Sequence, residues 1–328
     1  MAQGPEVSFC ATNLNTGDRL PAALESIRGL GAAVARPFEV VVADGPSEDG
    51  ARAFLEQAAR SDPRVRLIAH PFRNRGRGRR LAFEASRGTT IVPFDTSLAY
   101  APRYGELLRR YLALPTDAML FSEVCALRRT TVVSVGGWRD LVGGEDLDLY
   151  ARIIERFGVV AYPTAARESQ SERLSSYDRQ MRYVRGSRWR RARRIYEVQR
   201  DQIIGANYRV RDLMDFNRRK PAVRRGAYRL FFTAAAIGAR LSPLRPFAFD
   251  RNNYLILREE TFRSMLEGRH AALGWTEPGP KLVLSEDEVD YLDRDSALWK
   301  AERGRIRELY EVKERPADRP AADGAARI

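Results

Sequence analysis

The stretch EVVVADG, residues 39–45, decides the fold class of this 328-residue chain. Its unbroken β-branched run is typical of a strand that is buried on both faces, as in parallel sheets. Turn formers at 44–50 end the strand, and helical spacing then predicts a helix over 51–59. A strand, a polar turn and a helix therefore follow one another within about twenty residues.

The same alternation continues on both sides of this stretch. Strands are expected at 7–12, 65–69 and 89–94, and helices after Leu20 and at 81–86. This pattern predicts an α/β domain with a mostly parallel sheet. Ligands of such sheets bind beyond the carboxyl ends of the strands. Because Asn15, Asp44 and Asp95 each follow a predicted strand, we expect them to share one edge of the sheet.

A second polar cluster lies at GGEDLDL, residues 143–149, where a helical pattern begins. Glu145 and Asp146 would occupy the first turn of that helix, whose dipole and free N–H groups stabilise negative charge. A carboxylate kept ionised there can accept a proton from a substrate hydroxyl. Acidic first turns are also ordinary helix starts. The functional interpretation of this cluster therefore depends on the polar residues that follow the predicted strands before it.

Composition narrows the classes of protein and of metal site. Cys10, Cys125, His70 and His270 are too far apart for a zinc site, so any metal would be a hard cation bound through oxygen. The amino end carries neither the basic nor the apolar stretch of a signal peptide. The longest apolar run, 230–241, is too short to cross a bilayer. We therefore expect a cytoplasmic protein with no transmembrane helix.

The positive charge of the chain is concentrated in one segment. The net charge is +13, and residues 173–225 hold 16 Arg and one Lys against five acids. Such a concentration indicates an anionic partner, namely phosphates, acidic lipid or nucleic acid. The alternative is a solvated helical surface in a chain that uses 52 Arg but only four Lys.

Beyond residue 163 the pattern becomes mainly helical. Helices are predicted within 172–220, at 222–241, at 250–267 and at 287–313, and the Pro- and Ala-rich tail 315–328 is expected to be disordered. On 222–241, Arg225, Arg229, Thr233 and Arg240 share one face, and Leu230, Ala234, Ile237 and Leu241 lie toward the other. Two interpretations stay open: adsorption to the anionic inner face of a membrane, or packing on the catalytic domain.

An ordered set of motifs in the first 165 residues resembles the family 2 glycosyltransferases of the GT-A fold. The matching pieces, in chain order, are residues 7–15, 44–50, 74–82, 88–95, 128–138 and 145–149. The resemblance implies a mixed, mostly parallel sheet flanked by helices, with a helical basic extension after it. It divides the chain into a catalytic domain at 1–165, an extension at 166–314 that contacts the acceptor or a membrane surface, and the tail.

The resemblance also implies roles for individual residues. Thr12, Asn15, Asp44, Arg79 and Asp95 would bind a nucleotide-sugar donor. Asp95 and Ser97 would hold Mg²⁺ or Mn²⁺, and Gly137 and Trp138 would contact a glycan or lipid-linked acceptor. Asp146, with Glu145 beside it, would activate the acceptor hydroxyl for a transfer that inverts the anomeric carbon.

Two motifs depart from the family pattern. The metal motif DxD reads Asp95-Thr96-Ser97, so a hydroxyl or water replaces the second acid, and Gly45-Pro46 stands where the family has Asp-Gly. Asp44 and Asp95 also suit strand-end turns without any ligand. The run 73–80, RNRGRGRR, is expected to form a loop beside the diphosphate, although such runs also bind nucleic acid.

Three functions therefore stay open from the sequence. The leading one is a metal-assisted glycosyltransferase. The second is a binding module that has the fold without the catalysis, suggested by the incomplete DxD. The third is a basic nucleic-acid-binding protein, suggested by the charge of 173–225, and the apolar face of 222–241 argues against it.

Overall fold

The computed structural model describes residues 4–162, 187–216, 218, 222–245, 251–274 and 281–313. Its first part is a five-stranded sheet in the order β3-β2-β1-β4-β6. The strands are β1 (Val7–Asn13), β2 (Phe38–Asp44), β3 (Val65–Ala69), β4 (Thr90–Pro93) and β6 (Leu127–Arg128). All pairs are parallel except β4 with β6. The α/β fold with a mostly parallel mixed sheet is confirmed, and four predicted strands agree within one residue.

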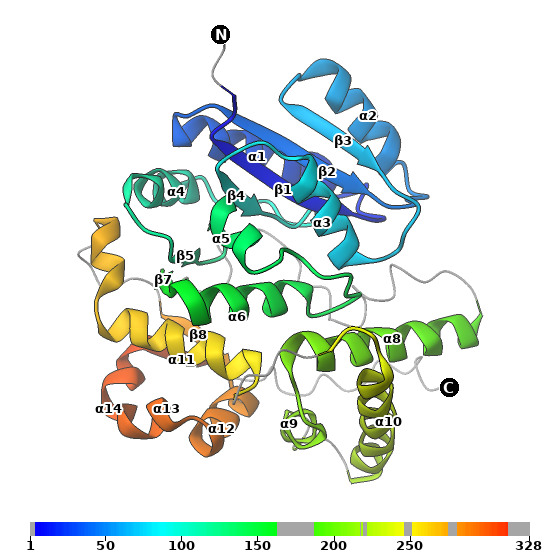
Figure 1. The fold of residues 1–328 in the computed structure, drawn as a ribbon, viewed down its shortest axis with the longest axis vertical. Coiled ribbons are helices and arrows are strands. Elements are labelled where there is room, and N and C mark those ends of the chain that lie inside the picture. The colour runs from blue at the N-terminus through cyan, green and yellow to red at the C-terminus, as the bar shows by residue number, and fades with distance from the viewer. Residues whose placement is uncertain are drawn as a thin grey trace.

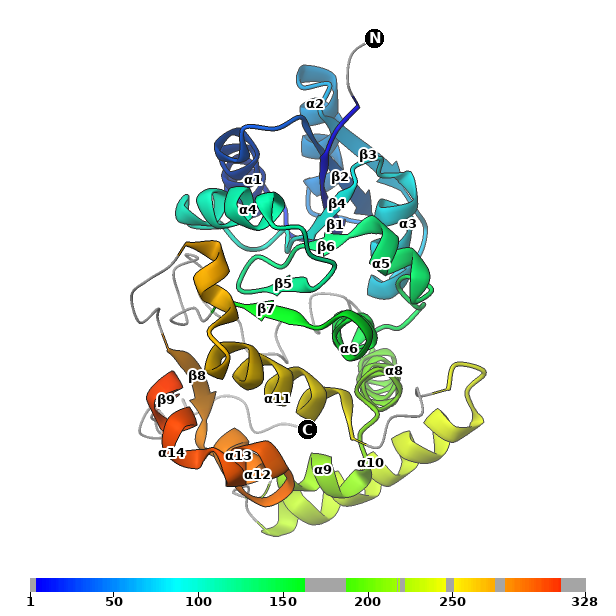
Figure 2. The same cartoon turned by 60° about the vertical axis from the view of Figure 1, so that its left-hand side comes forward.

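Helices cover both faces of this sheet (Figures 1 and 2). They are α1 (Leu20–Val34), α2 (Ala51–Ser61), α3 (Arg75–Ala85), α4 (Arg103–Ala113), α5 (Arg129–Ser134) and α6 (Glu145–Phe157). Alternate residues of β2 serve the two faces: Val40 and Val42 pack with α1, α2 and α4, whereas Val41 and Ala43 pack with α3 and α6. The apolar run at 39–43 is thus explained by burial on both sides.

The order of the strands reverses beside β1. The chain moves outward from β1 to β2 and β3, then returns to place β4 on the other side of β1. At such a switch point the two connections leave in opposite directions and open a crevice at the carboxyl ends of the strands. Asp44 ends β2 and Asp95 follows β4, so both lie at this edge, one on each side of β1. Their predicted shared placement is confirmed.

The run RNRGRGRR was predicted as a loop, and this is wrong for most of it. Helix α3 begins at Arg75, and the Asn74 side chain caps it by accepting a hydrogen bond from the Arg77 amide at 2.9 Å. The glycines that suggested a loop serve close packing instead. A methyl group on Gly76 would collide with the Arg139 carbonyl, and one on Gly78 with the Thr12 hydroxyl.

The second part of the chain is mainly helical and lies beyond α6 (Figure 1). It contains α8 (Arg188–Ala206), α9 (Val210–Asp215), α10 (Ala222–Leu241), α11 (Asn253–Leu266), α12 (Glu286–Asp295), α13 (Ala297–Ala301), α14 (Arg303–Ile306) and two 3₁₀ turns, Arg269–Leu273 and Arg307–Leu309. Two small parallel strand pairs complete the fold: β5 (Met119–Phe121) with β7 (Val159–Ala161), and β8 (Leu282–Ser285) with β9 (Tyr310–Lys313).

Some predictions for the helical part of the chain are confirmed, some are wrong, and some fall outside the described residues. The helix at 222–241 is confirmed to the residue. The single charged helix at 287–313 is wrong, because Ser285 and Ser296 cap separate helices and the chain then turns into β9. The tail 315–328, the boundary at 165 and the arginines before residue 187 lie outside the described residues. In the described residues, no helix is long and apolar enough to cross a membrane.

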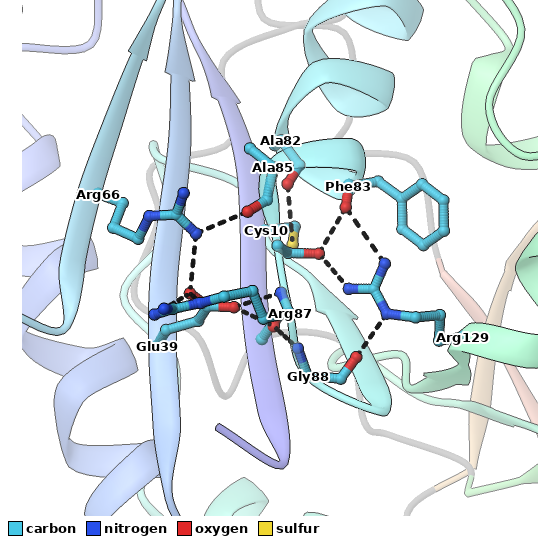
Figure 3. A network of polar contacts seen from close by, with 11 residues as sticks. Cys10, Glu39, Arg66, Ala82, Phe83, Ala85, Arg87, Gly88 and Arg129 are labelled. Atoms are coloured by element: carbon cyan, nitrogen blue, oxygen red, sulfur yellow. Dashed lines mark hydrogen bonds and ion pairs between the residues drawn. The ribbon is translucent and has the colours of Figure 1, made fainter. Parts of the chain in front are cut away.

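A polar network closes the amino end of the sheet (Figure 3). Glu39, 1% exposed, accepts hydrogen bonds from the Ser8 hydroxyl at 2.8 Å, the Arg87 amide at 2.5 Å and the Arg66 guanidinium at 3.2 Å. Burial opposes its charge, but these donors together hold the pKa of Glu39 below its usual value. Arg129 ties the same end to Gly88 at 2.7 Å. These bonds join β1, β2 and the start of β4.

Candidate active site

Arg79 joins the two strands that flank the switch point. Its guanidinium donates to the Cys10 carbonyl of β1 at 3.3 Å and to the Phe94 carbonyl after β4 at 2.7 Å. The side chain is 6% exposed, and its other terminal nitrogen, Nη2, lies 3.2 Å from Asp146 Oδ2. In this structure the predicted donor-binding arginine thus holds strand ends and a carboxylate together, and its contact with a nucleotide stays a prediction.

Asp146 is fixed from two directions at the start of α6. Arg79 binds one of its carboxylate oxygens, and the Trp138 indole N–H donates to the other at 2.9 Å. The Asp146 side chain remains 24% exposed. Two charge-assisted contacts therefore orient a carboxylate that still reaches solvent, which suits a group that must meet a substrate hydroxyl.

Trp138 itself is buried rather than open to an acceptor. The residue is 2% exposed and packs against Phe83, with ring centroids 5.7 Å apart. Gly136 and Gly137 before it take left-handed conformations, with φ of +82° and +67°, which only glycine adopts readily. The predicted acceptor contact of Gly137 and Trp138 remains untested, and the geometry gives them an indirect role through Asp146.

Glu145 lies deeper than its neighbour. Its side chain is 3% exposed, and Arg75 Nε lies 3.0 Å from its Oε1. Burial raises the pKa of Glu145, and Arg75 opposes this shift. Arg75 also lies 3.9 Å from Asp146. The pair thus shares one guanidinium, which offsets part of the cost of burying the Glu145 carboxylate.

Asp95 completes the group of carboxylates. Burial would raise its pKa, but Arg75 and the hydrogen bonds from Ser97 outweigh burial, and the pKa of Asp95 is lowered. Its Oδ1 accepts from the Ser97 amide at 2.9 Å and hydroxyl at 2.8 Å. Arg75 therefore acts electrostatically on three carboxylates that come from two separate motifs.

The residues at this site suit a cation that arrives with a diphosphate. Among the described residues, no group of three or more His, Cys, Asp or Glu side chains could hold a metal ion. Mg²⁺ commonly takes one or two protein carboxylates and completes its shell with waters and substrate phosphates. Asp95 offers one such carboxylate, and Ser97 offers a hydroxyl already bonded to it.

Both carboxylate oxygens of Asp44 are occupied by neighbouring side chains. It is fully buried, and its Oδ1 accepts from Asn13 Nδ2 and Ser47 Oγ, each at 2.7 Å. Arg52 Nε lies 2.8 Å from the other oxygen. A direct contact between Asp44 and a nucleobase would require Ser47 or Arg52 to move, so this predicted contact stays untested.

The loop after β1 is tied to the loop after β2. Asn15 lies in the left-handed region, with φ of +54°. Its side-chain oxygen accepts a hydrogen bond from the Glu48 backbone amide at 2.8 Å, and its backbone amide donates to the Ser47 hydroxyl at 3.1 Å. Thr12, at the end of β1, packs directly against Gly78 of α3. Both predicted donor-binding residues therefore lie at the switch point.

Sequence reasoning missed three residues that organise the site. Arg75 was assigned to a loop, although it begins α3 and reaches both acidic residues of α6. Asp148, fully buried, binds Arg139 and Arg152, and Arg152 in turn donates to the Gly137 carbonyl at 2.8 Å. Asp201 of α8 accepts from the Val142 amide at 2.7 Å. The acidic triplet 145, 146 and 148 was the available signal for Asp148, whereas Asp201 gave none.

Comparison with known protein families shows a sequence similarity that is confined to the first part of the chain. Residues 8–125 match the sequence model of glycosyl transferase family 2. Over these residues the chain is similar to that family. The family 2 match contains the predicted donor-binding residues and ends before the acidic pair of α6, so the roles of Glu145 and Asp146 rest on their geometry.

Individual proteins also resemble parts of the chain. The chain is 42% identical over 84 residues to Glycosyltransferase AglD of Haloferax volcanii, an alignment that spans 25% of this chain and 13% of that protein. Two solved structures resemble it at low identity. The mannosyltransferase PcManGT of Pyrobaculum calidifontis, in complex with GDP-Man and Mn²⁺, is 16% identical over 83% of this chain and 87% of its own, with a TM-score of 0.43. S. aureus TarS 1–349, in complex with UDP-GlcNAc, is 12% identical over 81% of each chain, with a TM-score of 0.44.

Proposed function

We propose that the protein transfers a sugar from a nucleotide-diphosphate donor to an acceptor hydroxyl with inversion at the anomeric carbon. One observation carries the proposal: at the switch point of a sheet that resembles family 2, Arg75 lies 3.0 Å from Glu145 and 3.9 Å from Asp146, and its charge lowers the pKa of Asp95. Charge of both signs is thereby concentrated where α/β enzymes bind ligands.

Asp146 is the proposed general base. Inversion requires the hydroxyl to attack the anomeric carbon from the side opposite the diphosphate while its proton passes to a carboxylate. Asp146 is the more exposed of the two acids, and Arg79 and Trp138 hold it in one orientation. Glu145 would act through Arg75, keeping that guanidinium in place.

The leaving diphosphate needs positive charge as its bond to the sugar breaks. Asp95, with Ser97, would hold Mg²⁺ or Mn²⁺ against the diphosphate, and the cation would stabilise that charge. Thr12, Asn15 and Asp44 would line the nucleotide side of the crevice. The acceptor, a glycan or a lipid-linked sugar, would approach beside Asp146.

The test is release of nucleoside diphosphate from a panel of nucleotide sugars, measured with Mn²⁺ and with EDTA. Turnover that needs the cation and is lost in Asp146→Asn supports the proposal. A panel in which every donor stays intact, while nucleoside diphosphates still raise the melting temperature, would favour a catalytically inactive binding module. This second candidate is considered because the Asp95-Thr96-Ser97 motif has only one acid with which to bind a metal ion.

A further inference from the structure

Helix α10 carries an apolar stripe that no described element covers. Leu230, Ile237 and Leu241 are 77%, 55% and 79% exposed, and Ala234 between them is also exposed. Their spacing of four, three and four residues places them in one line along the helix. Few large apolar side chains are so exposed elsewhere in the described chain, and such a contiguous patch marks an interaction site.

The packing of α10 explains why this stripe points outward. Phe232, Ala235 and Ala239 are buried in a core cluster with residues of α8 and α9. On a helix these three lie nearly opposite the stripe, since each residue turns by about 100°. The side of α10 that faces the protein is therefore already occupied, and the stripe is left outside this core.

The flank of the stripe is positively charged. Arg225, Arg229 and Arg240 are exposed along one side, and α10 contains no acidic residue over its twenty positions. Neighbouring α8 adds exposed Arg190, Arg191 and Arg193 around Trp189, which is 85% exposed. Arginines beside an apolar face are typical of helices that lie in a membrane interface.

We propose that α10 docks the protein on the anionic surface of a lipid bilayer. Leu230, Ile237 and Leu241 would enter the boundary between headgroups and acyl chains, while the flanking arginines bind acidic headgroups. Membrane contact of this kind needs no transmembrane span. The proposal is independent of the proposed activity and is tested by binding alone.

Charge and area favour a membrane over other occupants. A second copy paired stripe to stripe would bring two arginine rows together, and one row of four side chains is well short of the roughly 800 Å² per partner typical of stable dimers. Nucleic acid would use the arginines and leave the apolar stripe in water. An acidic bilayer satisfies both features at once.

Helix α8 lies between the exposed stripe of α10 and the loop that precedes α6. α8 packs against α10 on one side and against α6 on the other. Its Asp201 holds the Val142 amide, and Gly205 packs against Gly144 immediately before the acidic pair. A membrane bound at α10 would therefore lie one helix away from the loop that leads into Glu145 and Asp146.

The experiment is co-sedimentation of the full chain with vesicles of phosphatidylcholine alone or mixed with phosphatidylglycerol. The protein is expected to bind the mixed vesicles and to be released by salt. Ile237→Ser should weaken this binding about 10-fold. The combined change Arg229→Gln with Arg240→Gln should weaken it about 30-fold.

Matched controls come from elsewhere on the surface. Val133 of α5 is a similar β-branched side chain, 61% exposed, and Arg60 of α2 is an exposed arginine. Val133→Ser and Arg60→Gln should bind as the unchanged protein does. Circular dichroism should give one melting curve for all variants, because each replaced side chain is exposed.

Four results would overturn the proposal. They are no binding to mixed vesicles, equal binding to neutral and mixed vesicles, α10 variants that bind as well as their controls, and a dimer in light scattering that Ile237→Ser dissolves. The last would assign the stripe to a second copy of the chain.

Discussion

The two ends of the parallel sheet both bury a carboxylate against arginines. At the amino end, Glu39 accepts from Ser8, Arg66 and Arg87, and its pKa is lowered. At the carboxyl end, Glu145 has Arg75 as its ion-pair partner, and burial raises its pKa. The charge of Glu39, on β2, is thus stabilised by its donors, whereas the charge of Glu145, at the start of α6, is opposed by burial.

The opposite pKa shifts of Glu39 and Glu145 indicate which end of the sheet adds to the stability of the fold and which end reduces it. A carboxylate with several donors and a lowered pKa stabilises the folded state at neutral pH. A buried carboxylate beside another acid, with a raised pKa, is common where a protein does chemistry. The amino end therefore holds the strands together, and the carboxyl end is the place to look for catalysis.

The largest expected effect is the loss of transfer when Asp146 becomes Asn. Removing a general base lowers the rate by about 10²–10⁴, while donor binding should stay near normal. Asp140→Asn is the matched control, because Asp140 lies in the loop just before α6 and pairs with Arg80 of α3 at 3.1 Å. The measurement is the steady-state rate of transfer at saturating donor for Asp146→Asn, Asp140→Asn and the unchanged protein. Equal losses in both variants would mean that the loop, not the base, was damaged.

Breaking the amino end should cost stability instead of rate. Glu39→Gln is expected to lower the free energy of unfolding by about 2 kcal/mol at neutral pH, because it removes the buried charge that accepts hydrogen bonds from Ser8, Arg66 and Arg87. Since the pKa of Glu39 is lowered, its stabilisation is present above the unfolded-state pKa and is lost as pH falls through the folded-state pKa. Urea unfolding of both proteins should therefore converge in acid.

The control for this change is Glu84→Gln, which alters an exposed glutamate of α3 and should shift unfolding little. The rate of transfer per folded Glu39→Gln molecule should be unchanged. A stable Glu39→Gln protein with a lowered rate would contradict the division of labour between the two ends.

A smaller effect is expected from Trp138→Phe. The ring is retained, but the hydrogen bond to Asp146 is lost, and the rate should fall about 10-fold. Trp299 offers a matched case, since its indole donates to Asp293 at 2.7 Å in the helical part of the chain. Trp299→Phe should reduce stability without reducing the rate per folded molecule. Similar rates for both variants would remove the indole from the catalytic account.

The smallest effect is expected from the exposed arginines of α10. Arg229→Gln with Arg240→Gln should change the free energy of unfolding by less than about 0.5 kcal/mol, as surface replacements usually do. Arg79→Gln, by contrast, should clearly destabilise the protein, because it removes bonds to Cys10, Phe94 and Asp146. Thermal unfolding of the two proteins side by side makes this comparison.

The sequence predicted the sheet and its polar edge because period and turn chemistry are local signals. The β-branched run at 39–43 was sufficient to place Asp44, and the apolar run at 89–94 was sufficient to place Asp95. The start of α3 was missed because glycine suggests a loop, whereas Gly76 and Gly78 are small to admit neighbouring segments. That requirement comes from tertiary packing, which no local pattern carries.

The partners of the acidic pair were beyond local reasoning for the same reason. Arg75 lies 70 positions before Glu145, and Asp201 lies 59 positions after Val142. In the extension, charge alternation predicted one long helix at 287–313, but serine caps divide it into short ones. The exposed stripe of α10 was predicted as a face, and only the packed structure identifies it as uncovered.

The measurement that tests the central claim most directly is calorimetric titration with UDP and GDP, with and without Mn²⁺. The account predicts cation-dependent binding to the unchanged protein, its loss in Asp95→Asn, and its retention in Asp146→Asn. Binding that Asp95→Asn leaves intact, or that neither nucleotide provides in the presence of Mn²⁺, would contradict the assignment of this edge of the sheet as the donor site.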